Sequence, residues 1–138
     1  LSEVDPAHRA IYEENLAAFG REIENLHAEL KSLFAASQGT RFMVVHPSWG
    51  YFAQAYGLEQ VAVEIEGKDP KPAQLQELIR RARADGIRVV FAQPQFSAKS
   101  AEMIAREIGG GVIAADPLAA DWAANLRAVA LKFQAALR

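Results

Sequence analysis

The chain has 138 residues, of which 51% are hydrophobic and 23% charged; this length suits one compact domain with a buried core and argues against disorder. Fifteen basic side chains against 17 acidic ones give a formal net charge of −2, which lacks the basic excess typical of proteins that bind nucleic acid. There is no cysteine, so disulfides, cysteine-based metal clusters and a thiol nucleophile are excluded. We expect no transmembrane helix and see no signal-peptide pattern in these residues.

The beginning of the chain predicts one long helix over residues 6–36. Asp5 before Pro6 is typical of a helix N-terminus, and the apolar residues that follow are spaced by three and four, which places them on one stripe of an α-helix. The stripe consists of Leu16, Phe19, Ile23, Leu26, Leu30 and Leu33. At 1.5 Å per residue this helix is about 45 Å long, more than a domain of this size needs. We therefore expect it to be a backbone helix that braces two bodies.

The rest of the chain alternates between two patterns. Short apolar runs rich in Val and Ile predict strands that are buried on both faces. These runs span residues 41–45, 60–65, 87–92 and 111–115. Helical patterns follow them at residues 49–56, 72–84, 98–108 and 121–137. The alternation predicts an α/β fold in which a four-stranded parallel sheet has helices on both faces, preceded by the long helix.

The residues that follow the strands are the first candidates for function, because open parallel sheets bind ligands beyond the carboxyl ends of their strands. These candidates are His46, Glu66, Gln93, Gln95 and Asp116. His46, Gln93 and Asp116 each precede a proline, which keeps the preceding residue extended at the end of its strand.

His46 and Asp116 could act together as ligands of a divalent metal ion, since imidazole and carboxylate groups bind zinc and also suit manganese. Two ligands do not complete a site, because structural zinc takes four. Both residues also have simpler interpretations, His46 as a polar residue that ends a strand and Asp116 as a turn residue before the last helix. Trp49 fits either a core position or the wall of a pocket near the same strand ends. His8 and His27, on the long helix, are expected to face solvent.

Two segments of the sequence resemble the solute-binding proteins of zinc and manganese ABC transporters, the TroA-like and ZnuA-like family. They are FMVVHPSWGYFAQAYGLEQVAVEIEGKDPKPAQLQELI and VVFAQPQFSAKSAEMIAREIGGGVIAADPLAADWAANL, and the opening LSEVDPAHRAIYEENLAAF is similar to the start of the family's long helix. The resemblance implies two four-stranded lobes joined by that helix, with one metal ion between them and no enzymatic activity. It implies that His46 and Asp116 are the two ligands from the second lobe. Gln93, where the family often has Glu, and Gln95 are expected at most to support them.

The resemblance also implies a first lobe with two further ligands, usually His, and nothing in these residues matches it. We therefore expect an excised or processed chain with the backbone helix at 1–38 and the C-terminal lobe at 39–138, carrying half of a metal site. The expected cargo is Zn²⁺, with Mn²⁺ as the alternative, because manganese prefers a larger share of oxygen ligands.

Several partners and a location follow from the resemblance. The partners are the missing lobe, an ABC transporter permease and other copies of this chain, which would associate through the exposed stripe of the helix; no nucleic acid is expected. The location is periplasmic or extracytoplasmic in a bacterium, with a lipid anchor if it is Gram-positive, and cell adhesion is an associated activity.

Two other classes of function stay open. A small α/β module for an organic anion would use His46, Gln95 and Lys99 as polar contacts. An enzyme would use His46 as a base oriented by Asp116, although the sequence offers no evident nucleophile and no nucleotide-binding loop. In the metal-binding reading, an acceptor should fix the tautomer of His46, and the sequence does not identify that acceptor.

Overall fold

The computed structural model describes residues 1–137, and Arg138, the last residue of the predicted lobe, lies outside them. The strands are Arg41–Val44 (β1), Glu59–Ala62 (β2), Val89–Ala92 (β3) and Gly111–Ala114 (β4). The helices are Arg9–Leu33 (α1), Gly50–Ala55 (α2), Pro72–Ala84 (α3), Lys99–Glu107 (α4) and Trp122–Ala136 (α5), with a short 3₁₀ turn at Pro6–His8 (η1).

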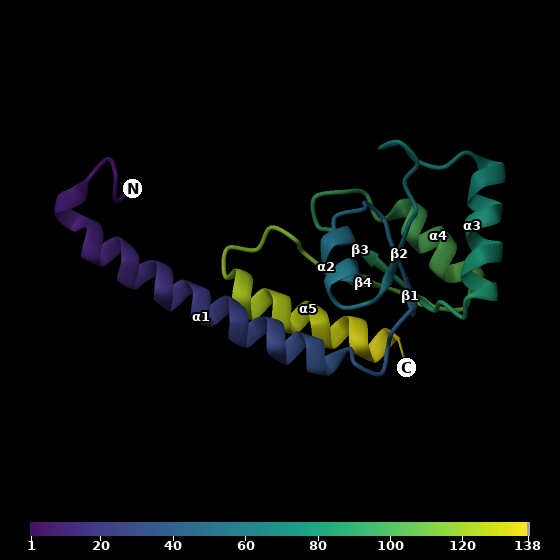
Figure 1. Cartoon of the computed structure of the whole chain (residues 1–138). Coiled ribbons are helices and arrows are strands. Elements are labelled where there is room, and N and C mark those ends of the chain that lie inside the picture. The colour runs from purple at the N-terminus through teal and green to yellow at the C-terminus, as the bar shows by residue number, and fades with distance from the viewer. Residues whose placement is uncertain (138) are drawn as a thin grey trace.

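The four strands form one parallel sheet in the order β2-β1-β3-β4. This confirms the predicted α/β fold with the long helix in front. Helices α1 and α5 lie against one face of the sheet, and α3 and α4 lie against the other (Figure 1). Because all strands are parallel, their carboxyl ends meet at a single edge of the sheet, which is where such folds bind ligands.

The core divides into two layers because successive strand residues point to opposite faces. Phe42, Val44 and Phe91 face α1 and α5, whereas Met43 and Val90 face α3 and α4. The first layer centres on Phe133 of α5, which is fully buried. Its ring centroid lies 4.6 Å from that of Phe42 and 4.2 Å from that of Phe91. Both central strands are therefore buried on both faces, as their continuous apolarity predicts.

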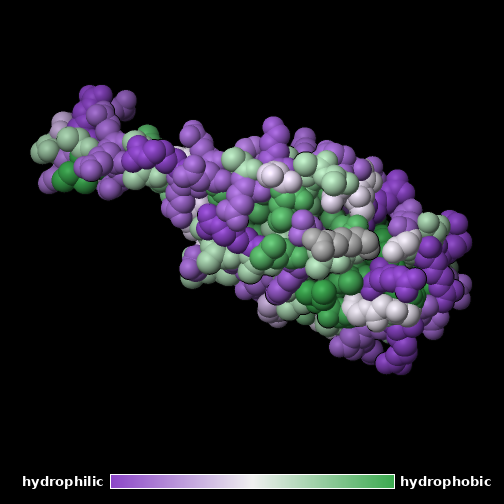
Figure 2. All heavy atoms as spheres, turned by 90° about the horizontal axis from the view of Figure 1, so that it is seen from below, coloured by the Kyte–Doolittle hydropathy of each residue, from purple (hydrophilic) through white to green (hydrophobic). Residues whose placement is uncertain are grey.

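Helix α1 packs against the lobe through only part of its length. Leu26 and Leu30 are buried against the lobe, while Leu16, Phe19 and Ile23 are 71%, 48% and 44% exposed. The first half of the helix projects away from the lobe (Figure 1), and apolar side chains are scattered among polar ones on the face seen in Figure 2. The predicted stripe thus has a buried half and an exposed half.

The start of the long helix departs from the prediction in detail. Asp5 stands at the beginning of η1, but its side chain makes no capping bond to the backbone. Its carboxylate instead accepts the Tyr12 hydroxyl at 2.8 Å, a bond that raises the pKa of Tyr12. Among residues 1–137, no helix has the combination of length and apolarity that crossing a bilayer requires.

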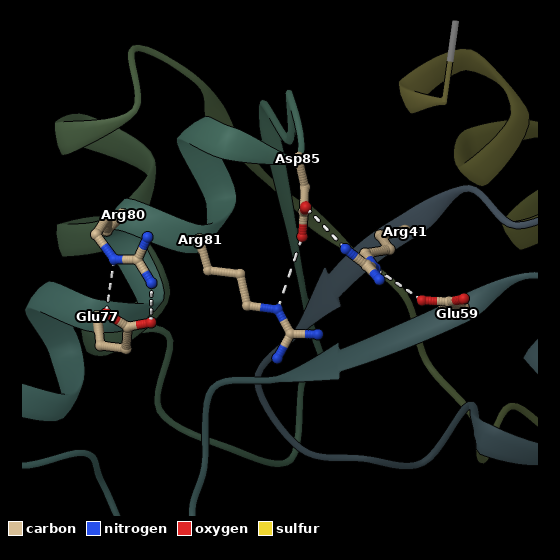
Figure 3. Close-up of polar contacts among 6 residues, drawn as sticks. All are labelled: Arg41, Glu59, Glu77, Arg80, Arg81 and Asp85. Carbon is tan, nitrogen blue, oxygen red and sulfur yellow. Dashed lines mark hydrogen bonds and ion pairs between the residues drawn. The ribbon is translucent and has the colours of Figure 1, made fainter.

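The amino edge of the sheet is held by ion pairs (Figure 3). Arg41, at the start of β1, donates to Glu59 at 2.7 Å and to Asp85 at 2.9 Å, and these bonds, first the one to Glu59, raise the pKa of Arg41. Asp85 also lies 3.7 Å from Arg81. Since these strands are parallel, this cluster lies at the edge opposite to the candidate site. Its charged side chains therefore do not take part in that site.

Candidate metal centre

His46 follows β1 at the carboxyl edge, and its ring is oriented by a neighbouring carboxylate. Nδ1 of His46 lies 2.7 Å from Oε2 of Glu64, which follows the adjacent strand β2. The side chain of Glu64 is 13% exposed and that of His46 is 38% exposed. Because a carboxylate only accepts hydrogen bonds, Nδ1 carries the hydrogen in this pair. The lone pair of a neutral imidazole is then on Nε2, free to bind a metal ion.

The backbone and the ring face of His46 are also held. The side-chain amide of Gln93, which is buried, accepts the backbone N–H of His46 at 3.3 Å and donates to the backbone carbonyl of His46. The ring of Phe96 stacks on the imidazole, with 4.4 Å between centroids and 19° between planes. Gln93 thus contacts the backbone of His46, and its support of a metal ligand stays a prediction. Residues after β2 and after β3 thus hold the ring and the backbone of His46, which itself follows β1.

Asp116 follows β4 at the same edge, and three hydrogen bonds hold it. Its Oδ1 accepts from Nε2 of Gln95 at 2.7 Å and from the backbone N–H of Leu118 at 2.9 Å, and its backbone carbonyl accepts from Asn125 at 2.7 Å. The two bonds to Oδ1, first the one from Gln95, lower the pKa of Asp116. The bond to Leu118, two residues on, is that of an Asx turn, so Asp116 also has the turn role that its position allows.

The two candidate ligands are separated by one strand. The sheet order places β3 between β1 and β4, and neighbouring strands lie about 4.8 Å apart, so the axes of β1 and β4 are about 10 Å apart. The turn after β3 bridges this gap, because Gln93 contacts His46 and Gln95 contacts Asp116. Within residues 1–137, no three or more His, Asp or Glu side chains gather into a group that could hold a metal ion.

Three other sequence expectations have definite outcomes. Trp49 is only 3% exposed and packs against Phe133, so of its two interpretations the core position is the one observed and the pocket wall is not. Glu66 does not stand at the end of β2; it occupies a turn with φ of 53° and is exposed. His8 and His27 are both exposed on the N-terminal helical segment, as predicted.

Glu64 is not among the predicted site residues, because the apolar run predicts a second strand that continues to residue 65. The strand ends at Ala62, and a turn at Glu66 and Gly67 has positive φ at both residues. Consecutive positive φ values are typical of a tight turn between extended segments. This turn begins directly after residue 65, where the predicted strand ends, so the local pattern carried no signal that β2 stops at Ala62.

The fold and the site define a parallel α/β lobe with two side chains of metal-ligand type at its carboxyl edge and a long helix attached to it. Comparison with known proteins narrows this class. The family described as "Zinc-uptake complex component A periplasmic" matches residues 1–136. The chain therefore belongs to this zinc-uptake family.

Individual relatives agree with this assignment. The high-affinity zinc uptake system protein ZnuA of Paracoccus denitrificans is 35% identical over 115 residues, which cover 82% of this chain and 34% of that protein. A crystal structure of ZnuA is 47% identical and superposes with a TM-score of 0.96, covering 99% of this chain and 52% of the other. The laminin-binding protein Lmb of Streptococcus agalactiae, an adhesin with metal-transporting activity, is 26% identical, with a TM-score of 0.89 and coverages of 99% and 56%. The chain thus spans about half the length of these solved structures and about a third of the curated relative.

Proposed function

We propose that the chain is the C-terminal part of the extracytoplasmic zinc-binding component of a bacterial ABC transporter. In this proposal residues 1–38 form the backbone helix, residues 39–138 form the metal-binding lobe, and His46 and Asp116 are two ligands of the transported Zn²⁺. The observation that carries the proposal is the contact between Nδ1 of His46 and Glu64 at 2.7 Å. It leaves Nε2 free on an imidazole at the same sheet edge as the Asp116 carboxylate.

The proposed mechanism is capture and release without covalent chemistry. His46 and Asp116 bind the ion from one side, and a first lobe supplies the remaining ligands, so that closure of the two lobes and metal binding are one event. The loaded protein then delivers the ion to its membrane permease. A lipid anchor would hold the protein at the surface of a Gram-positive cell. Since imidazole nitrogen contributes to the site, zinc is favoured over manganese.

The chain alone should bind zinc weakly. Complete zinc sites in small peptides contribute about 10–16 kcal/mol, and half of the expected ligands are outside this chain in the proposal. Binding should also weaken as the pH falls, because the imidazole must be deprotonated to coordinate the ion.

A titration of the chain with Zn²⁺, followed by backbone amide NMR shifts, tests the proposal. We expect shifts centred on residues next to His46 and Asp116, and we expect His46→Ala or Asp116→Asn to abolish them. His27→Ala is the matched control, since His27 is an exposed imidazole on α1, and it should leave the titration unchanged. Zinc binding that survives either site variant would contradict the proposal, as would tight one-to-one binding by the monomer.

A further inference from the structure

Asp116 uses only one of its two carboxylate oxygens in contacts within residues 1–137. Oδ1 accepts two hydrogen bonds, from Nε2 of Gln95 at 2.7 Å and from the backbone N–H of Leu118 at 2.9 Å. An ionised carboxylate offers about two lone-pair sites on each oxygen, so these two donors fill Oδ1. Oδ2 has no hydrogen-bond or ion-pair partner in this part of the chain.

Gln95, which donates to Oδ1 of Asp116, belongs to a turn that is held by its own hydrogen bond. The backbone N–H of Phe96 donates to the carbonyl of Gln93 at 3.1 Å, which closes the turn around Gln95. Gln93 and Phe96 both contact His46. The four residues after β3 (93–96) therefore contact both His46 and one oxygen of the Asp116 carboxylate.

We propose that Gln95 determines the metal preference of this site by restricting Asp116 to a single coordinating oxygen, Oδ2. The inference rests on the proposed function, because it requires Asp116 to be a metal ligand. Gln95 acts through Asp116 and is a positioning residue, with no contact to the ion.

The chemistry of the two candidate ions explains the effect. Zinc sites are mostly four-coordinate and are completed by single donor atoms, so a carboxylate that offers one oxygen suits them. Manganese prefers six oxygen-rich ligands in octahedral geometry, and a carboxylate that coordinates through both oxygens would move the site toward that number. Because Gln95 and Leu118 both donate hydrogen bonds to Oδ1, Oδ1 has no lone pair left for the metal, and only Oδ2 can coordinate it. Gln95 thus discriminates against manganese by withholding a ligand, which is how specificity is often gained.

The test compares the affinities of this chain for Zn²⁺ and Mn²⁺ in two variants of Gln95. Gln95→Leu removes the donor at similar size, and Gln95→Asn keeps an amide but shortens it by one methylene group. Gln76→Leu, at an exposed position on α3, is the matched control. Zinc affinity is measured by competition with a chromophoric chelator, and manganese affinity by the electron paramagnetic resonance signal of the free ion.

We expect the ratio of zinc to manganese affinity to fall about tenfold in both Gln95 variants, the size typical of changes next to metal ligands, and to stay constant in the Gln76 control. A purely structural role for Gln95 would weaken both metals equally, and an unchanged ratio would overturn the inference. The variant Asp116→Asn distinguishes a failure of this inference from a failure of the proposed function. If it weakens zinc binding while Gln95→Leu leaves the ratio unchanged, only the inference fails. If it leaves zinc binding intact, the proposed function and the inference fail together.

Discussion

Glu64 offers the sharpest test of how the candidate site is built, because it touches the proposed ligand His46 and would not touch the ion. Removal of such a partner typically costs 10- to 100-fold in metal affinity, or about 1.4–2.7 kcal/mol. The short contact of 2.7 Å and the 13% exposure of the Glu64 side chain argue for the upper part of this range when the acceptor is removed. We therefore expect Glu64→Ala to weaken zinc binding about 100-fold. Glu64→Gln retains a carbonyl acceptor without the charge, and we expect about tenfold.

The assay is the same zinc titration by NMR, with circular dichroism to establish that each variant is folded. Glu66→Gln is the control, since it removes one negative charge at an exposed turn position two residues from Glu64. It should change zinc affinity little, because exposed charges are screened. Equal losses in Glu64→Gln and Glu66→Gln would mean that only the overall charge of the edge matters. Native affinity in Glu64→Ala would refute the argument that this carboxylate orients the imidazole.

Three further predictions concern stability, titration and association. Phe133→Ala should destabilise the fold by about 3–5 kcal/mol in denaturant unfolding, because it empties the fully buried centre of one core layer; Leu131→Ala, at a 58% exposed position of the same helix, should change it by less than about 0.5 kcal/mol. The lowered pKa of Asp116 means that its contribution to stability is present above the unfolded-state pKa and is lost as the pH falls through the folded-state pKa. Gln95→Leu should raise the pKa of Asp116 toward its usual range in a carboxyl NMR titration, and no change would refute the assignment of cause. Self-association of the chain at high concentration should be reduced by Leu16→Glu on the exposed part of α1 in sedimentation experiments; a native chain that stays monomeric throughout would contradict this expectation.

The sheet could be predicted from the sequence because its signals are local and redundant. Each strand is a short β-branched run, each following helix has its own apolar spacing, and the alternation of the two leaves few topologies. Boundaries were less accurate: the run at 60–65 corresponds to a strand at Glu59–Ala62, because apolar residues continue past the last paired one. The order β2-β1-β3-β4 depends on contacts between segments far apart in the chain, which the local pattern does not contain.

In the candidate site, too, the features set by the local sequence could be predicted, whereas the contacts between distant segments could not. The position of His46 and Asp116 at one edge follows from parallel strands and from the prolines after them. The partner of His46, Glu64, comes from the segment after β2, 18 positions away, and its identification requires the register between β1 and β2. The burial of Trp49 likewise depends on Phe133, more than 80 positions later, around which the first core layer forms.

The two sides of the proposed site rest on strands with different numbers of neighbours. β1 is bonded to β2 and β3, whereas β4 is an edge strand bonded only to β3. Native-state amide exchange should therefore be slowest around Val44 and faster around Ala114, since local opening in proteins begins where fewer contacts must break. A site that loosens at the carboxylate while the imidazole stays fixed would release its ion stepwise, and the edge strand would set the order of the steps.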